Sequence, residues 1–103
     1  MSSPVNIFIE ALKSLTSRVL VERQRDYLLV LFNVDSKEIT LCFRKGQYTS
    51  VYYAKLALTS DLLSLDCTEL EYSPHGLYVF SENPVNLAES VIKKAKILAM
   101  RSS

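Results

Sequence analysis

The residues from Tyr27 to Val34 (YLLVLFNV) form an apolar run that is rich in the residue types favouring β-strands. The run is far shorter than the roughly 18 apolar residues that indicate a membrane span, and the polar turn 35–37 ends it. We therefore predict a buried strand. Because successive side chains of a strand point to opposite faces of its sheet, a strand that is apolar at odd and even positions needs cover on both faces.

The next residues predict strands that are neighbours in sequence. Residues 38–44 alternate, with Ile39, Leu41 and Phe43 on one face and Thr40, Cys42 and Arg44 on the other. A turn at 45–46 then leads to a third strand over 47–54. Turns this short cannot carry the crossover that parallel neighbours need, so these three strands should form an antiparallel meander.

A second hairpin is predicted further along the chain. Residues 68–72 (TELEY) alternate, 73–76 (SPHG) have turn chemistry, and 77–80 (LYVF) should pair back on them. Between the two groups of strands lies a linker, 55–65, in which Ser60 could cap one or two helical turns through Leu65.

Both ends of the chain predict helices. Ser3 is a suitable N-cap and Pro4 a suitable first helical residue, and an apolar stripe follows at Val5, Phe8, Ile9, Leu12 and Leu15. A second helix should begin near Pro84, with Asn86 and Glu89 spaced as a capping box. Its apolar stripe comprises Leu87, Val91, Ala95 and Leu98, and its basic residues gather toward its C-terminus, where they suit the helix dipole.

These elements predict a single α+β domain over residues 1–103, with an antiparallel sheet of about five strands packed by the N- and C-terminal helices. Residues 16–26 fit a solvated helix or a short strand equally well. The helices can cover one face of the sheet. A second copy of the chain, the 16–26 segment or the linker could cover the other.

We expect the second copy, because small chains expose much surface per residue. The residues expected to pack in this homodimer or on the sheet faces are Leu29, Leu31 and Phe32.

Composition excludes several functional classes. Twelve Lys and Arg against 11 Asp and Glu give a formal charge of +1, which is unlike a protein that coats DNA. Two cysteines, Cys42 and Cys67, are too few for a disulfide framework and indicate small buried hydrophobes in a reducing compartment. The N-terminus lacks the pattern of a signal peptide, so we expect a cytoplasmic location and no membrane association.

The sequence contains no catalytic or cofactor signature. Its two glycines, Gly46 and Gly76, lie in separate turns and cannot form a phosphate-binding loop. A single histidine, His75, cannot build a metal site without carboxylates. A Cys67–His75 nucleophile and base is the only catalytic pairing available, and we rank it far below a non-enzymatic function without metal or cofactor.

The segment 44–53 (RKGQYTSVYY) is the most suggestive for binding, because it combines basic residues with three of the six tyrosines. Tyrosine and arginine are favoured at protein interfaces. We therefore predict a protein-binding or adaptor module, a homodimer that docks a further, unidentified protein through its sheet. The predicted contact residues are Arg44, Lys45, Tyr48, Tyr52 and Tyr53.

The alternative is a small nucleic-acid-binding protein. Aromatic side chains on a sheet beside Arg or Lys can stack on bases, and the candidates are Arg44, Lys45, Tyr48, Tyr52 and the cluster Lys93, Lys94, Lys96 and Arg101. Residues 47 and 49, where an RNA-recognition strand would place aromatic rings, are Gln and Thr, which favours the protein-binding interpretation.

The order of helix, three strands, short helical linker, two strands and helix resembles that of the secretion chaperones, which dimerise and bind an extended segment along their sheets. The resemblance extends over most of the chain and rests on element order, with no diagnostic motif. Those chaperones are typically acidic, whereas this chain is nearly neutral. The resemblance implies a dimer and a peptide ligand.

Overall fold

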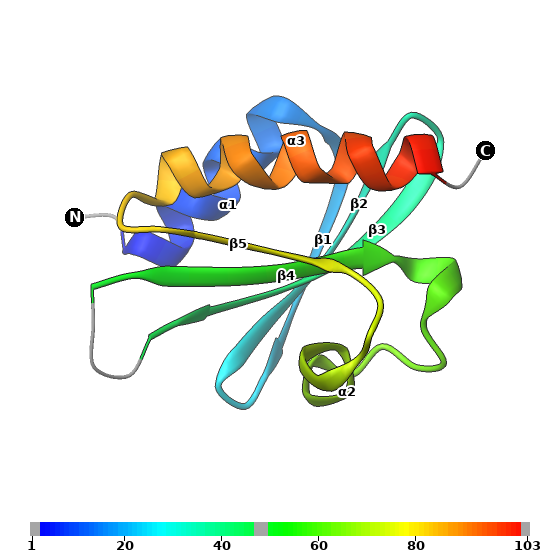
Figure 1. Ribbon diagram of the computed structural model, residues 1–103. Coiled ribbons are helices and arrows are strands. Elements are labelled where there is room, and N and C mark those ends of the chain that lie inside the picture. The colour runs from blue at the N-terminus through cyan, green and yellow to red at the C-terminus, as the bar shows by residue number, and fades with distance from the viewer. Residues whose placement is uncertain (1–2, 47–49, 102–103) are drawn as a thin grey trace.

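A computed structural model describes residues 3–46 and 50–101 and shows the expected α+β architecture (Figure 1). The helices are α1 (Pro4–Leu15), α2 (Cys67–Tyr72) and α3 (Pro84–Arg101), and the single 3-10 turn among the described residues is η1 (Thr59–Asp61). The strands are β1 (Ser17–Gln24), β2 (Tyr27–Val34), β3 (Lys37–Lys45), β4 (Tyr52–Leu58) and β5 (Leu77–Ser81).

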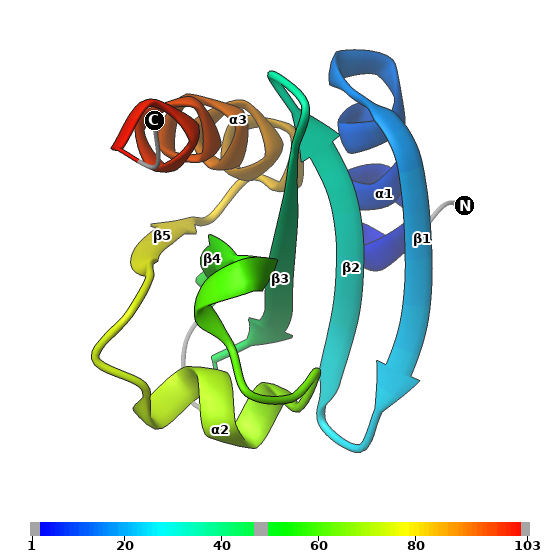
Figure 2. The ribbon, with the colours of Figure 1, turned by 90° about the vertical axis from the view of Figure 1, so that its right-hand side faces the viewer.

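The five strands form one antiparallel sheet in sequence order, β1-β2-β3-β4-β5. Helices α1 and α3 lie on one side of it, which we call the helix face, and α2 lies on the other, which we call the second face (Figures 1 and 2). In Figure 2 the sheet curves between these layers, with β1 and β5 at its two edges. Both faces of β2 are therefore covered by parts of the same chain.

The N-terminal helix begins and packs as its sequence predicts. The Ser3 side chain accepts a hydrogen bond from the backbone N–H of Asn6 at 3.1 Å, and Pro4 is the first helical residue. Phe8 and Leu12 are fully buried in the main core. Leu15, the last residue of the predicted stripe, is 46% exposed, because the helix ends there.

The C-terminal helix also forms where expected, but a different residue caps it. The Asn83 side chain accepts hydrogen bonds from the backbone N–H groups of Val85 and Asn86 at 2.8 and 3.2 Å. Asn86 is thus inside the first turn as a donor, and the predicted capping box is wrong. The apolar stripe packs on the sheet as predicted, with Leu87, Val91 and Ala95 fully buried and Leu98 nearly so.

Two boundaries differ from the sequence prediction. The open segment 16–26 becomes the edge strand β1, most of which is exposed. The third strand predicted at 47–54 is observed as β4 at 52–58, so the start of the predicted linker is strand, while residues 47–49 lie outside the described ranges. Pairing with β3 explains the longer strand, because Ile39 is opposite Leu58 and Phe43 is opposite Ala54.

The largest correction concerns residues 68–72, which were predicted as a strand and belong to helix α2. Asp66 caps this helix by accepting a hydrogen bond from the Thr68 N–H at 2.8 Å, and Cys67 and Leu70, three residues apart, turn one face inward. Strand β5 consequently pairs with β4 instead of forming the predicted second hairpin. Gly76 permits this approach, because its φ is +99° and a Cβ there would lie 2.7 Å from the Leu56 carbonyl oxygen.

Among the described residues, no helix is both long enough and apolar enough to cross a membrane.

Candidate functional site

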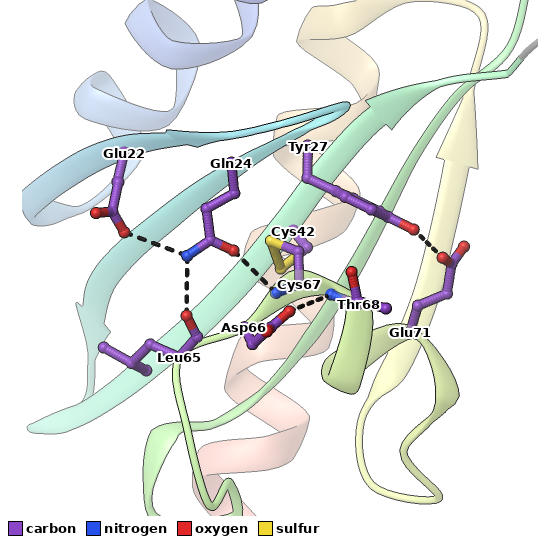
Figure 3. Close-up of a disulfide and its surroundings, with 9 residues drawn as sticks. All are labelled: Glu22, Gln24, Tyr27, Cys42, Leu65, Asp66, Cys67, Thr68 and Glu71. Atoms are coloured by element: carbon purple, nitrogen blue, oxygen red, sulfur yellow. Dashed lines mark hydrogen bonds between the residues drawn. A yellow bond between two sulfur atoms is a disulfide. The ribbon is translucent and has the colours of Figure 1, made fainter.

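The second face of the sheet carries a small buried cluster centred on a disulfide (Figure 3). Cys42 of β3 is bonded to Cys67 at the start of α2, and both side chains are nearly inaccessible to solvent. Leu29, Ala57 and Leu70 complete the buried cluster. The expectation of two free cysteines is therefore wrong: the two sulfurs, 25 residues apart in sequence, meet because α2 folds back onto β3.

A glutamine side chain fastens the start of α2 to the edge strand β1. The Gln24 amide oxygen accepts a hydrogen bond from the Cys67 backbone N–H at 3.0 Å. The Gln24 amide nitrogen donates to the Leu65 carbonyl oxygen at 2.9 Å (Figure 3). Gln24 thereby satisfies backbone groups at the helix N-terminus that have no partner within the helix.

A buried lysine fastens the other end of α2. Lys55 of β4 is 6% exposed, and its Nζ donates to the carbonyl oxygens of Glu71 and Ser73 at 3.2 and 2.6 Å. A cation at this position suits the negative end of the helix dipole. Burial removes water from the ammonium group and lowers the pKa of Lys55 below its ordinary value of 10.5.

The Glu71 carboxylate joins α2 to three strands. It forms an ion pair with Arg44 at 3.0 Å and accepts a hydrogen bond from the Tyr27 hydroxyl. Tyr78 donates to the Glu71 carbonyl oxygen at 2.9 Å. The pKa of Tyr78 is raised above its ordinary value of 10.0, first by burial and then by the negative charge of Glu71.

Beside this network, three aromatic side chains and one arginine form a surface that we call the aromatic face: Arg44, Tyr53, Tyr78 and Phe80. The rings of Tyr53 and Phe80 are cross-strand neighbours with centroids 6.3 Å apart, and the Arg44 guanidinium lies 5.2 Å from the Tyr53 ring centroid. Phe80 is 70% exposed and Tyr78 51% exposed. The aromatic face is therefore a large unburied apolar surface at the β5 edge.

The structure separates the residues that the sequence analysis proposed for partner contact. Arg44 and Tyr53 lie together on the second face, as cross-strand neighbours. Lys45 and Tyr52 are the next pair along the strands and therefore belong to the helix face. There Tyr52 stacks on Phe43 with ring centroids 5.8 Å apart. Tyr48 lies outside the described residues.

The three residues expected in a dimer or on a sheet face also separate. Phe32 is fully buried under the helices, and Leu29 is covered by α2 and the disulfide, so neither side chain is available to a second copy in this conformation. Leu31 is half-buried on the second face, opposite Leu20, which is 64% exposed.

Sequence reasoning missed Tyr78, Phe80 and Glu71 as parts of this site. The alternation of residues 77–80 did predict a strand with Tyr78 and Phe80 on one face. It could not show that this strand pairs with β4, which brings Phe80 beside Tyr53. Glu71 was assigned to a solvent-facing strand position, whereas the helix turns its carboxylate toward Arg44 and Tyr27.

The remote catalytic pair gains no support. The Cys67 sulfur is bonded to Cys42 and is not a thiolate, and His75 is an exposed turn residue whose backbone N–H is hydrogen-bonded to the Ser73 hydroxyl at 3.0 Å. In residues 3–46 and 50–101, no three His, Cys, Asp or Glu side chains gather as metal ligands.

Comparison with known proteins yields no match, whether the chain is set against family models, curated proteins or solved structures.

Proposed function

We propose that the protein is a non-enzymatic binding module that docks a protein segment on its aromatic face. The observation that carries this proposal is the exposure of Phe80 and Tyr78 beside Tyr53 and Arg44 on one sheet face. Exposed aromatic rings grouped with an arginine have the composition of interface anchors. Because β5 is an edge strand, an extended segment could add main-chain hydrogen bonds to these side-chain contacts.

The electrostatics of the aromatic face favour a protein segment over a nucleic acid. Arg44 is paired with Glu71, and Lys55 is buried against backbone carbonyls, so both cations next to the rings are already engaged. The basic residues of α3, Lys93 to Arg101, belong to a helix on the opposite side of the sheet (Figure 1). Phosphate binding draws on clustered cations, which this face lacks among the described residues.

The test is selection of peptides from a random extended-peptide library on the wild-type protein, followed by affinity measurement. We expect selected peptides to bind in the micromolar range and to lose about tenfold or more in affinity with Phe80→Ala combined with Tyr78→Ala. Val85→Ala is a control at an exposed apolar residue on the helix side, and it should leave affinity unchanged.

Selected peptides that bind the double variant as tightly as the wild type would overturn the docking site. Single-stranded RNA provides the other arm of the same experiment. Retention that weakens steeply with salt and is lost in the double variant would replace a protein ligand with a nucleic acid.

The proposal includes self-association as a homodimer and a cellular location. The disulfide favours an oxidising compartment, whereas the cysteine-poor composition favours the cytoplasm, where thiols are kept reduced. Trapping of free thiols in intact cells distinguishes the two locations, because only a reducing compartment leaves Cys42 and Cys67 open to alkylation after denaturation.

A further inference from the structure

A second, separate surface lies between the segment that follows β4 and helix α2. It is an open groove of about 640 Å³. Leu62 and Leu70 line it as covered side chains, and Leu63 and Tyr72 line it as exposed ones, with Leu63 fully exposed and Tyr72 81% exposed. A groove with apolar walls of this size accommodates apolar side chains of a partner.

The charges at this groove have one sign near neutral pH. Asp61 and Glu69 line it, and neither Lys nor Arg is among the described residues that do so. The remaining titratable groups at the groove are the exposed His75 and the Tyr72 hydroxyl. An apolar groove with acidic edges is complementary to an apolar segment flanked by basic residues.

Helix α3 of the same chain presents a surface of that composition. Its exposed stripe, which we call the basic stripe, comprises Lys93, Lys96, Ile97, Met100 and Arg101. These residues are spaced i, i+3, i+4, i+7 and i+8, so they share one face of the helix. The buried residues of α3, such as Ala95 and Leu98, occupy the opposite face. Ile97 is 38% and Met100 73% exposed.

The groove and the basic stripe are neighbours on the molecule. A smaller cavity is lined by Asp61 and His75, which also line the groove, and by Arg101 of the stripe. Because the two complementary surfaces are adjacent, two copies related by a two-fold axis can each place the stripe in the groove of the other. This arrangement is closed, so it produces a dimer instead of a chain of copies.

We propose that two copies of the protein associate by exchanging basic stripes, with Ile97 and Met100 of each copy seated in the α2 groove of its partner and the lysines beside Asp61 and Glu69. This inference rests on the homodimer proposed above for the identity of the partner. It is independent of the aromatic face.

Charge reversal tests the exchange. The groove variant Asp61→Lys with Glu69→Lys, and the stripe variant Lys93→Glu with Lys96→Glu, each set like charges against each other in a homodimer. We expect both variants to dimerise about tenfold or more weakly than the wild type in sedimentation velocity at low salt. The control Glu10→Lys with Glu38→Lys makes the same charge change at exposed sites elsewhere and should dimerise normally.

Mixing the two reversed variants gives the sharper result. In a mixed dimer one contact pairs reversed groove with reversed stripe and the other pairs two unchanged surfaces, so both contacts are again complementary. We expect the mixture to form heterodimers of wild-type strength, with circular dichroism confirming that each variant is folded. A second pair, Leu63→Ser and Ile97→Ser, removes the apolar contact without changing charge and should also weaken dimerisation.

The outcomes separate the two proposals. A wild-type protein that stays monomeric at about ten micromolar overturns both the homodimer and this interface. A wild-type dimer that the groove and stripe variants leave unchanged keeps the homodimer and overturns the interface. Folded reversed variants that fail to form heterodimers when mixed overturn the exchange as well.

Discussion

The two faces of the sheet are covered in different ways. On the helix face, α1 and α3 bury a continuous apolar core that reaches across β2, β3, β4 and β5. On the second face, the six-residue helix α2 buries a cluster of Leu29, Cys42, Ala57, Cys67 and Leu70. A helix of six residues is too short to be stable by its own hydrogen bonds. The second face therefore depends on a disulfide and on polar contacts at both ends of α2.

The comparison teaches that the apolar strand β2 needs no second chain to cover it. Leu28, Val30 and Phe32 belong to the main core, and Leu29 belongs to the disulfide cluster. It also predicts how each face fails. Loss of the helix face should unfold the domain, whereas loss of a contact under α2 should release that helix and leave the rest folded.

The largest effect is expected at the helix face. Leu12→Asp and Leu98→Asp each place a carboxylate in the main core, where an unpaired charge costs several kcal/mol, comparable with the roughly 5 to 15 kcal/mol that stabilises a domain. Both variants should lose their cooperative urea transition. Leu15→Asp, in α1 but at a 46% exposed site, is the matched control. A core variant that melts within a few degrees of the parent would place that residue outside the core.

The disulfide should give the next largest effect. With 25 residues between the cysteines, the chain-entropy model gives about 3 kcal/mol of stabilisation. Cys42→Ala with Cys67→Ala should lower the free energy of unfolding by that amount while keeping the helical circular dichroism of α1 and α3. Wild-type protein reduced before measurement should give the same value. A double variant as stable as the oxidised wild type would mean that polar contacts alone hold α2.

A smaller effect is expected from the glutamine at the start of α2. Gln24→Ala leaves the Cys67 N–H and the Leu65 carbonyl without their side-chain partner, at a cost of about 1–2 kcal/mol in unfolding free energy. Arg23→Ala, at the neighbouring exposed residue of β1, should change stability by less than about 0.5 kcal/mol. Equal effects of the two substitutions in urea unfolding would remove Gln24 from the contacts that hold α2.

The smallest effect is a pH dependence from Lys55. Its pKa is lower in the folded state, so as pH rises toward 10.5 the folded protein releases this proton before the unfolded chain does, and stability gains. The difference in unfolding free energy between wild type and Lys55→Met should thus shift in favour of the wild type from pH 8 to about 10. Both proteins should carry Tyr78→Phe, because the raised pKa of Tyr78 produces the opposite trend above pH 10. A constant difference would mean that Lys55 is solvated.

The sequence predicted the helix face better than the second face, for a physical reason. Regular periodicity over many residues located α1, β2, β3 and α3, because burial of one long stripe determines each element. Residues 68–72 are too few to distinguish period 2 from period 3.6, since the apolar Leu70 between two glutamates fits both. The disulfide was equally hidden, because residues distant in sequence meet only through the fold.

The candidate site was predicted in part. The pair Arg44 and Tyr53 followed from the tyrosine-rich segment, and the opposite directions of Tyr52 and Tyr53 followed from strand alternation. Tyr78 and Phe80 were not assigned to the same face because their strand was paired with the wrong neighbour. Long-range strand pairing is a tertiary property that local pattern does not contain.

The most direct test of the contrast between the two faces is amide hydrogen exchange on the oxidised wild type and on Cys42→Ala with Cys67→Ala. Protection reports local opening, residue by residue. We predict that residues 67–72 lose protection in the double variant while α1, β2, β3 and α3 keep theirs. An equal loss of protection throughout the sheet and helices, or unchanged protection of α2, would contradict the dependence of the second face on the disulfide.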